Sequence, residues 1–151
     1  MTEFDDLMKA IQSATRKGLF RRRHIFELHG VATSDELDAL ERKIGIALPG
    51  DLRRWLLVLG YGIVDGDLCV QENWFSMIER GQLKGGALFA QDTLGNFYGF
   101  DKRGRIHFFS RSEQVFSTIS ESFFTFVQEL VRRDYKILEW VDSLATHPYD
   151  W

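Results

Sequence analysis

Cysteine, proline and long apolar runs are scarce in this chain of 151 residues, which has one cysteine and two prolines. A single cysteine excludes an internal disulfide, and the apolar neighbours of Cys69 in "DLCV" favour a small buried side chain over a nucleophile. No stretch approaches the roughly 18 apolar residues that a membrane span requires. The start "MTEFDDLMKA" is acidic where a signal peptide needs positive charge. We therefore expect a soluble, cytoplasmic protein with no membrane partner.

An excess of either charge is also absent, since the formal net charge is -3 and the pI is about 5.8. This balance gives no indication of direct nucleic-acid binding. The densest basic run is Arg21–Arg23, which falls short of a basic tract of about 5–8 residues. Two interpretations are open, a nucleic-acid patch and a solvated connector between two helices, and the second is more frequent for so short a run.

Motifs for metal, phosphate or nucleophilic chemistry are absent as well. The four histidines show no HExxH spacing, no CxxC exists, and no G-x-S-x-G marks a serine nucleophile. "GQLKGGAL" has the G-x-x-x-x-G spacing of a phosphate-binding loop. Such a loop needs lysine and then serine or threonine after the second glycine, but alanine and leucine follow here, so the motif is absent. A calcium loop starting at Asp65 would end on Ser76 rather than glutamate. We predict no metal, cofactor or catalytic residue; a hydrolase stays open as an alternative, which a pocket of perturbed ionisable groups would favour.

Helical patterns occupy both ends of the chain. With 44% hydrophobic and 14% aromatic residues, the chain can form the core of one domain. An N-terminal helix over residues 1–18 is predicted from Thr2 as cap, an apolar stripe and an end at Gly18. A capping box from Thr33 to Glu36 starts a second helix that ends at Gly45. A third helix follows Pro49. Helices within 121–146 are capped by Ser120 or Ser122 and bend near Asp134, and "YDW" forms an aromatic tail.

Short apolar runs separated by turn residues fill the middle of the chain. Turns are expected at Asp65-Gly66, Gly85-Gly86, Gly95-Asn96 and Arg103-Gly104. At the third turn Asn96 is expected to tolerate the left-handed conformation. The order of helices, strands and helices predicts a single α+β domain over residues 1–151, with an antiparallel meander flanked by N-terminal and C-terminal helices.

Three stretches together resemble the SUKH superfamily, the Smi/Knr-like family. The first is "GVATSDELDALERKIGIALPGDLRRWLLVLGYG", which resembles the family's E-x-x-[LI]-G-x-x-L-P signature. The others are the hairpin "DTLGNFYGFD" and the ending "IHFFSRSEQVFSTISESFFTFVQEL". The matching positions are Glu41, Ile44, Gly45, Leu48, Pro49, Trp55, Leu56, Gly60, Gly95, Asn96, Tyr98, Asp101, Ser122 and Phe123. The resemblance implies a family-like core at about 30–130, preceded by an accessory helix.

This resemblance implies a function by binding, without catalysis or cofactor. The superfamily includes fungal cell-wall synthesis regulators and bacterial immunity proteins, which neutralise toxin domains that are frequently nucleases. A toxin partner is therefore expected, with a regulatory or scaffolding role on a cellular partner as the alternative. Because nuclease active sites are usually basic, acidic residues beside aromatic anchors are the predicted contacts. These candidates are Tyr61, Asp65, Asp67, Glu72, Trp74 and Phe75.

For each candidate a structural role is the competing interpretation. Trp74 and Phe75 are large enough to belong to the core, and the acidic residues could be ordinary solvated loop positions. The hairpin aromatics Phe97, Tyr98 and Phe100 alternate between faces, so one set is expected to enter the core. The set on the opposite face is a second candidate contact surface.

Overall fold

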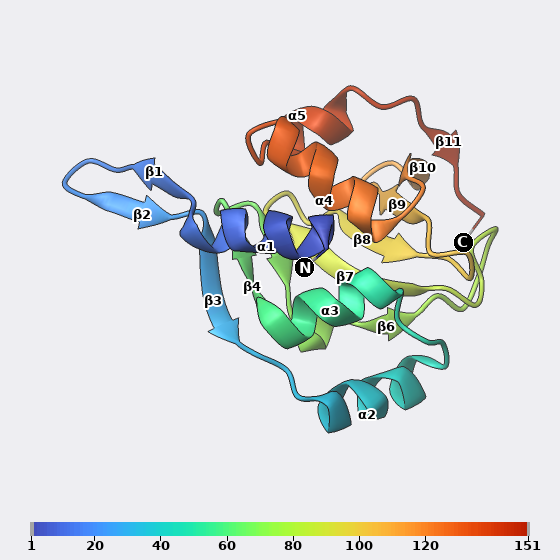
Figure 1. The fold of residues 1–151 in the computed structure, drawn as a ribbon. Coiled ribbons are helices and arrows are strands. Elements are labelled where there is room, and N and C mark those ends of the chain that lie inside the picture. The colour runs from blue at the N-terminus through green and yellow to red at the C-terminus, as the bar shows by residue number, and fades with distance from the viewer. Residues whose placement is uncertain (1, 151) are drawn as a thin grey trace.

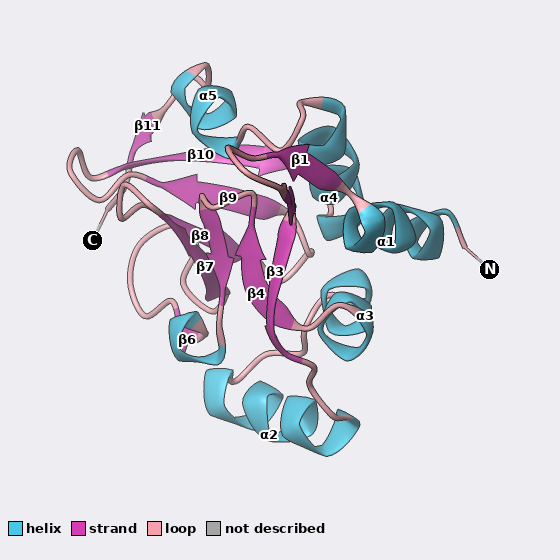
Figure 2. Ribbon diagram, turned by 90° about the vertical axis from the view of Figure 1, so that its left-hand side faces the viewer, coloured by secondary structure: helices cyan, strands magenta, loops and turns pink. Residues whose placement is uncertain are grey.

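An antiparallel sheet with helices on one face organises the chain (Figures 1 and 2). The computed structural model describes residues 2–150. Within that range the helices are α1 (Glu3–Ser13), α2 (Ser34–Ile44), α3 (Gly50–Val58), α4 (Phe123–Arg132) and α5 (Ile137–Asp142), with a 3-10 turn η1 (Glu72–Trp74). The strands are β1 (Thr15–Lys17), β2 (Arg22–His24), β3 (Phe26–Gly30), β4 (Tyr61–Val64), β5 (Leu68–Val70), β6 (Ser76–Met77), β7 (Ala87–Asp92), β8 (Phe97–Phe100), β9 (Ile106–Phe109), β10 (Val115–Ser120) and β11 (His147–Pro148).

The main sheet confirms the predicted single α+β domain. Its strand order is β11-β10-β9-β8-β7-β5-β4-β3, with β6 paired to β7, and its neighbours are antiparallel. Helices α1, α3 and α4 contact one another and lie on one face of the sheet, here called the inner face. Between them and the sheet lies the main core, in which Trp55 packs edge-on against Phe26 and Phe123. The opposite face is called the outer face.

The predicted helix starts are found at the N-terminal ends of α1, α2 and α4. Thr2 and Asp5 form a capping box, Thr33 Oγ1 accepts from the Glu36 backbone N–H, and Ser122 caps α4. After α2, Gly45 takes the left-handed conformation with φ 75°. A residue other than glycine would be strained in this conformation, so glycine is the residue that suits the end of the helix.

The N-terminal helix is shorter than predicted, and the arginine run is not a connector between helices. Helix α1 ends at Ser13, and β1 and β2 then form a separate two-stranded hairpin in which Thr15 pairs with His24. At its turn the Gly18 N–H donates to the Arg21 carbonyl over 3.0 Å. The prediction failed because three adjacent arginines show no apolar alternation, the usual sign of a strand. Figure 1 shows this hairpin projecting from the body of the molecule.

An aspartate at the end of β7 organises the turn into β8. Its Oδ1 accepts from the backbone N–H groups of Leu94 and Asn96, and its Oδ2 accepts from the Tyr98 hydroxyl over 2.7 Å. This residue is Asp92. Gly95, with φ 85°, takes the left-handed conformation that was predicted for Asn96. The expectation for Asn96 is wrong because glycine adopts this conformation without a Cβ clash.

The next turn repeats the same arrangement nine residues later in the chain. Asp101 Oδ1 accepts from the backbone N–H groups of Arg103 and Arg105, and Gly104 has φ 79°. Asp101 Oδ2 faces His107 Nε2 at 2.9 Å, where the preceding turn has a tyrosine hydroxyl. Both turns therefore follow the pattern D-x-x-G-x-x-[YH], an internal repeat that the sequence analysis did not detect.

The C-terminal part breaks where predicted and then returns to the sheet. Asp134 and Tyr135 have φ 57° and 63°, so α4 cannot continue into α5. Beyond α5, β11 pairs with β10 through Val115–Pro148 and Phe116–His147. Strand β11 directly precedes the predicted aromatic tail, whose Tyr149 N–H donates to the Gln114 carbonyl over 2.8 Å. The last residue of the tail, Trp151, lies outside the described residues. No helix within residues 2–150 is long and apolar enough to cross a membrane.

Candidate protein-interaction surface

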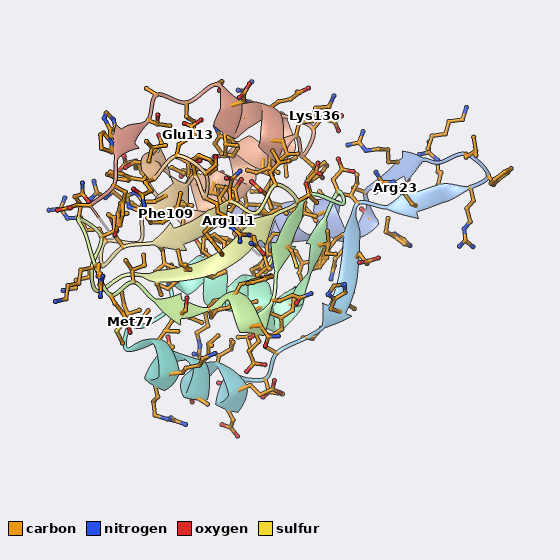
Figure 3. All side chains as sticks on the ribbon, turned by 180° about the vertical axis from the view of Figure 1, so that it is seen from behind. Arg23, Met77, Phe109, Arg111, Glu113 and Lys136 are labelled. Carbon is orange, nitrogen blue, oxygen red and sulfur yellow. The ribbon has the colours of Figure 1, made fainter. Side chains whose placement is uncertain are left out.

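One row of directly paired residues crosses the whole outer face. Successive strand registers join its members from β3 to β11, so their side chains share this face. In order they are Glu27, Ile63, Cys69, Gln91, Phe97, Phe109, Phe116 and His147. The row is polar or small on the β3 side and aromatic on the β11 side. Figure 3 views the molecule from behind, with this face toward the reader.

The aromatic half of the row is covered. Ile78 and Leu83, from the segment between β6 and β7, form a second hydrophobic cluster with Phe109 and Tyr149. The ring centroids of Phe109 and Tyr149 are 5.2 Å apart, and Phe109 is only 1% exposed. Phe97, the outward aromatic of the β7–β8 hairpin, is half-buried and packs against this cluster. This face of the hairpin is therefore covered by the chain rather than an open contact surface.

The other half carries an open depression, here called the outer hollow. Its volume is about 330 Å³, and its lining residues come from β3, β4 and the 3-10 turn: His29, Gly30, Tyr61, Gln71, Glu72 and Asn73. The Gln71 amide lies 3.1 Å from His29 Nδ1, and His29 Nε2 lies 3.0 Å from Glu27 Oε2. Such a chain of hydrogen bonds fixes the imidazole, the amide and the carboxylate relative to one another.

Tyr61 is the aromatic residue of the outer hollow. It is half-buried, and burial raises the pKa of its hydroxyl to about 12, with the charges of Glu72 and Glu36 acting in the same direction. Its ring meets Phe75 edge-on, with centroids 6.2 Å apart and planes at 87°. The hydroxyl therefore stays protonated at neutral pH and can serve as a hydrogen-bond donor to a partner.

The two candidate aromatics after η1 have different positions. Phe75 is 1% exposed and belongs to the main core, so the expectation that it lies on the surface is wrong. Its backbone N–H closes the 3-10 turn onto Glu72, and this turn directs the side chain inward under Tyr61. Trp74 stays half-buried. Its indole nitrogen is buried and interacts with the Cys69 thiol: burial raises the pKa of this thiol, and the Trp74 contact lowers it by less. The rest of the Trp74 side chain is partly exposed. Part of the Trp74 ring therefore remains available at the surface.

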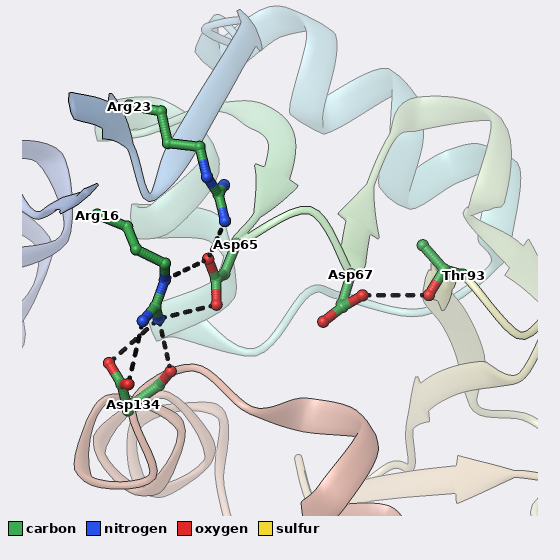
Figure 4. A network of polar contacts seen from close by, with 6 residues as sticks. All are labelled: Arg16, Arg23, Asp65, Asp67, Thr93 and Asp134. Atoms are coloured by element: carbon green, nitrogen blue, oxygen red, sulfur yellow. Dashed lines mark hydrogen bonds and ion pairs between the residues drawn. The ribbon is translucent and has the colours of Figure 1, made fainter. Parts of the chain in front are cut away.

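Asp65 is not a free surface carboxylate (Figure 4). Arg16 binds it in a bidentate manner, with Nε–Oδ1 at 3.0 Å and Nη2–Oδ2 at 2.9 Å, and Arg23 Nη2 reaches Oδ1 at 3.0 Å. The Asp65 side chain is 10% exposed. Two arginines neutralise its charge, so its place in the structure is at the base of the β1–β2 hairpin rather than in an acidic contact patch.

The remaining candidate acids differ in their environment. Asp67 Oδ1 accepts from the Thr93 hydroxyl over 3.2 Å, which ties the turn after β4 to the turn after β7. Glu72 is exposed at the rim of the outer hollow. The structure therefore brings Tyr61 and Glu72 together, and places Asp65 and Asp67 on the turn at the far end of β4.

Three residues around the hollow were missed from the sequence: Glu27, His29 and Gln71. In "FELHG" the apolar Phe26 and Leu28 alternate with Glu27 and His29, and this period of two is the sign of a strand. Because the arginine run directly before it was interpreted as a connector between helices, this segment was not predicted as a strand. Gln71 carries no recognisable pattern, because only the pairing of β4 with β5 brings it beside His29.

The described residues include no group of three His, Cys, Asp or Glu side chains that could hold a metal ion. The polar group nearest to a catalytic arrangement is Asp101, His107 and Thr118, with Thr118 Oγ1 3.1 Å from His107 Nδ1. His107 is 1% exposed, and burial lowers its pKa although the Asp101 carboxylate acts against this. No hollow reaches its ring among those that line the described surface. We interpret the group as a support for the turn.

The profile of the SMI1 / KNR4 family (SUKH-1) matches residues 31–129, well over half of the chain. The chain belongs to this family. The SUKH match includes η1, β4 and β5, and it begins one residue after β3 ends. No curated protein and no solved structure matches the chain. SUKH domains interact with proteins, so a protein is the expected class of partner.

Proposed function

We propose that this SUKH protein is an immunity protein that binds and neutralises a toxin domain through the outer hollow and its rim. The observation that carries the proposal is the open half of the outer face, where Tyr61 and Glu72 line the outer hollow and half-buried Trp74 follows in η1, all within the region matched by the family. The covered half offers no comparable surface, since its aromatics are packed under the chain.

The chemistry of the rim suits a partner with basic groups. Glu72 is exposed at the rim of the hollow, the exposed Glu27 contacts the lining residue His29, and Tyr61 lines the hollow with a protonated hydroxyl. Half-buried aromatics supply contact area at a low cost in side-chain entropy, and such residues often dominate binding energy. Acidic rim residues accelerate association with a basic surface. A nuclease toxin, whose active site carries positive charge, fits this combination.

Co-expression provides the test. The reading frame next to the gene would be induced with and without this protein, and growth would be followed by a pull-down of the complex. We expect the protein to restore growth and to co-purify with the toxin. The double variant Tyr61→Ala/Glu72→Lys is expected to lose rescue while it still folds, because both side chains lie at the surface of the hollow.

A matched control separates this effect from a general change in charge. Glu113→Lys makes the same charge change on an exposed loop of the covered half, and it should rescue growth like the unmodified protein. If the neighbouring product is not toxic, or if rescue occurs without a complex, the immunity proposal is overturned. A partner captured from the cell's own proteins would then favour a regulatory or scaffolding role.

A further inference from the structure

The two edges of the main sheet are finished differently. At one end β11 has only two residues, His147 and Pro148, and proline cannot donate a backbone hydrogen bond. At the other end β3 has five residues, none of them proline or lysine. Among the residues that the structure describes, no strand pairs with its outer side. The β3 edge therefore lacks the features that usually protect an edge from pairing.

The pairing of β3 with β4 shows which backbone groups face the open side. Asp65 N–H donates to the Ile25 carbonyl, and the register then places Glu27 opposite Ile63. In an antiparallel pair every second residue directs its N–H and C=O toward the partner strand. The C=O of Ile25 and the backbone groups of Glu27 therefore point to β4, whereas those of Phe26 and Leu28 point away from it. The Ile25 N–H is used elsewhere, since it donates to the Ala14 carbonyl over 3.0 Å.

Apolar and basic side chains surround this edge. Leu28 is 57% exposed, and Leu19 and Phe20 at the hairpin tip are 91% and 94% exposed. A groove of about 760 Å³, here called the hairpin groove, runs between the hairpin and β3 and is lined by Arg21, Arg22, Arg23, His24, Ile25, Phe26, Glu27, Leu28, Ile63 and Gly66. Arg21 and Lys17 make no ion pair with any described carboxylate.

We propose that the β3 edge and the hairpin groove bind an extended acidic segment of a partner protein by strand addition. The segment would pair with the outward N–H and C=O groups of Phe26 and Leu28. Its carboxylates would meet Arg21 and Arg22 of the hairpin, and its apolar side chains would cover Leu28. This site takes a partner of the opposite charge to the one that suits the outer hollow, and it does not depend on the proposed toxin.

Ion pairs at its base hold the β1–β2 hairpin beside the β3 edge. Arg16 and Arg23 bind Asp65, and Arg16 also bonds Asp134 on the α4–α5 junction at 3.2 Å. Arg21 and Arg22 take no part in these ion pairs and line the groove; Arg22 makes a neutral contact, from Nη1 to the Thr15 hydroxyl over 3.1 Å. A second copy of this chain is a poor occupant, because edge pairing would bring two basic hairpins together. The backbone edge favours a peptide over a lipid surface, which has no strand to add.

The test uses a fluorescein-labelled peptide of eight residues with alternating glutamate and valine, titrated with the full chain. We expect binding of this peptide, no binding of the lysine–valine counterpart, and no binding when alternate peptide nitrogens are methylated, since methylation removes the strand donors. Arg21→Glu/Arg22→Glu should weaken binding about tenfold or more. Arg42→Glu/Lys43→Glu, the same charge change on the exposed end of α2, should leave it unchanged.

Each other outcome overturns the proposal. Equal binding of the methylated peptide would show that the backbone edge is not used, and equal binding by the hairpin variant would remove the basic groove from the site. Sedimentation with phosphatidylserine vesicles without peptide binding would identify a membrane-binding tip instead. A concentration-dependent dimer that Leu28→Pro abolishes would identify a second copy as the occupant. The co-expression growth assay, carried out with the Arg21→Glu/Arg22→Glu variant, tests the toxin proposal independently of peptide binding at the β3 edge.

Discussion

The covered and open halves of the outer sheet face are formed by one continuous row of paired residues, yet only the open half offers a surface. On the covered half Phe109 packs against Tyr149 and the segment between β6 and β7. On the open half Ile63 and Cys69 are half-buried and the hollow beside them stays accessible. The strands alone do not determine which half can bind a partner; the segments that fold back over the sheet do.

The largest expected effect is on the covered half. Phe109→Ala should lower the free energy of unfolding by about 3–5 kcal/mol, because it leaves a cavity in a closed cluster. Urea unfolding followed by tryptophan fluorescence measures this. Gln91→Ala, in the same row on the open half, should cost far less. Similar losses for the two variants would show that the two halves are packed alike, which would contradict the difference between a covered and an open half.

The next largest effect is expected at the base of the hairpin. Asp65→Asn keeps the shape of the side chain but removes the charge that Arg16 and Arg23 share. We expect a loss of about 1.5–3 kcal/mol, as is typical of hydrogen bonds to charged groups. Asp67→Asn, on the same turn, has a neutral partner in Thr93 and should cost less. Calorimetry of both variants compares them, and equal losses would argue against a special role of the ion pairs.

A smaller effect is expected from pH, and it belongs to the covered half. Burial lowers the pKa of His107, so the unfolded chain binds the proton more readily. For Asp101 burial raises the pKa, but hydrogen bonds from His107 and Arg105 outweigh it, and the net direction is down. Both groups therefore contribute stability that is lost as pH falls, for His107 below about 6.5.

Denaturant midpoints measured between neutral pH and pH 5 test this dependence. His107→Gln should be less stable at neutral pH and should respond less steeply to acid. An unchanged slope in this variant would show that His107 does not account for the response.

The smallest effect on stability is expected at the rim of the open half. Glu72→Gln changes an exposed side chain and should alter the free energy of unfolding by no more than about 0.5 kcal/mol. With the toxin identified by co-expression, the same variant should bind it more slowly, because an acidic rim residue acts mainly on the association rate. Surface plasmon resonance at two salt concentrations measures that rate. A large loss of stability would show that Glu72 is part of the fold rather than of the site.

Local chemistry made part of the fold predictable. The caps at Thr2, Thr33 and Ser122, the glycine at position 45 and the break at Asp134 depend on backbone rules that act over a few residues. The β1–β2 hairpin does not depend on such local rules. Its base is fixed by Asp65 and Asp134, which lie 49 and 118 residues from Arg16 in the chain. No local pattern contains such a contact.

The candidate site was predictable to a smaller degree. Tyr61, Glu72 and Trp74 could be found as polar and aromatic residues beside a turn, but the sequence did not reveal that Phe75 turns inward beneath Tyr61. Nor did it reveal that Tyr149 covers the outward aromatics, because that requires the end of the chain to return to the sheet. Exposure is decided by distant segments, and a sequence pattern describes only neighbours.

The contact of Arg16 with both Asp65 and Asp134 also sets an order of events. Asp134 follows Arg16 by 118 residues, so it is synthesised well after residues 15–24. During synthesis Arg16 can therefore meet Asp65 before it can meet Asp134, and the set of ion pairs at the hairpin base stays incomplete until then. We expect the Arg16–Asp134 contact to form only when the α4–α5 junction has docked, so its presence reports that the C-terminal half has folded.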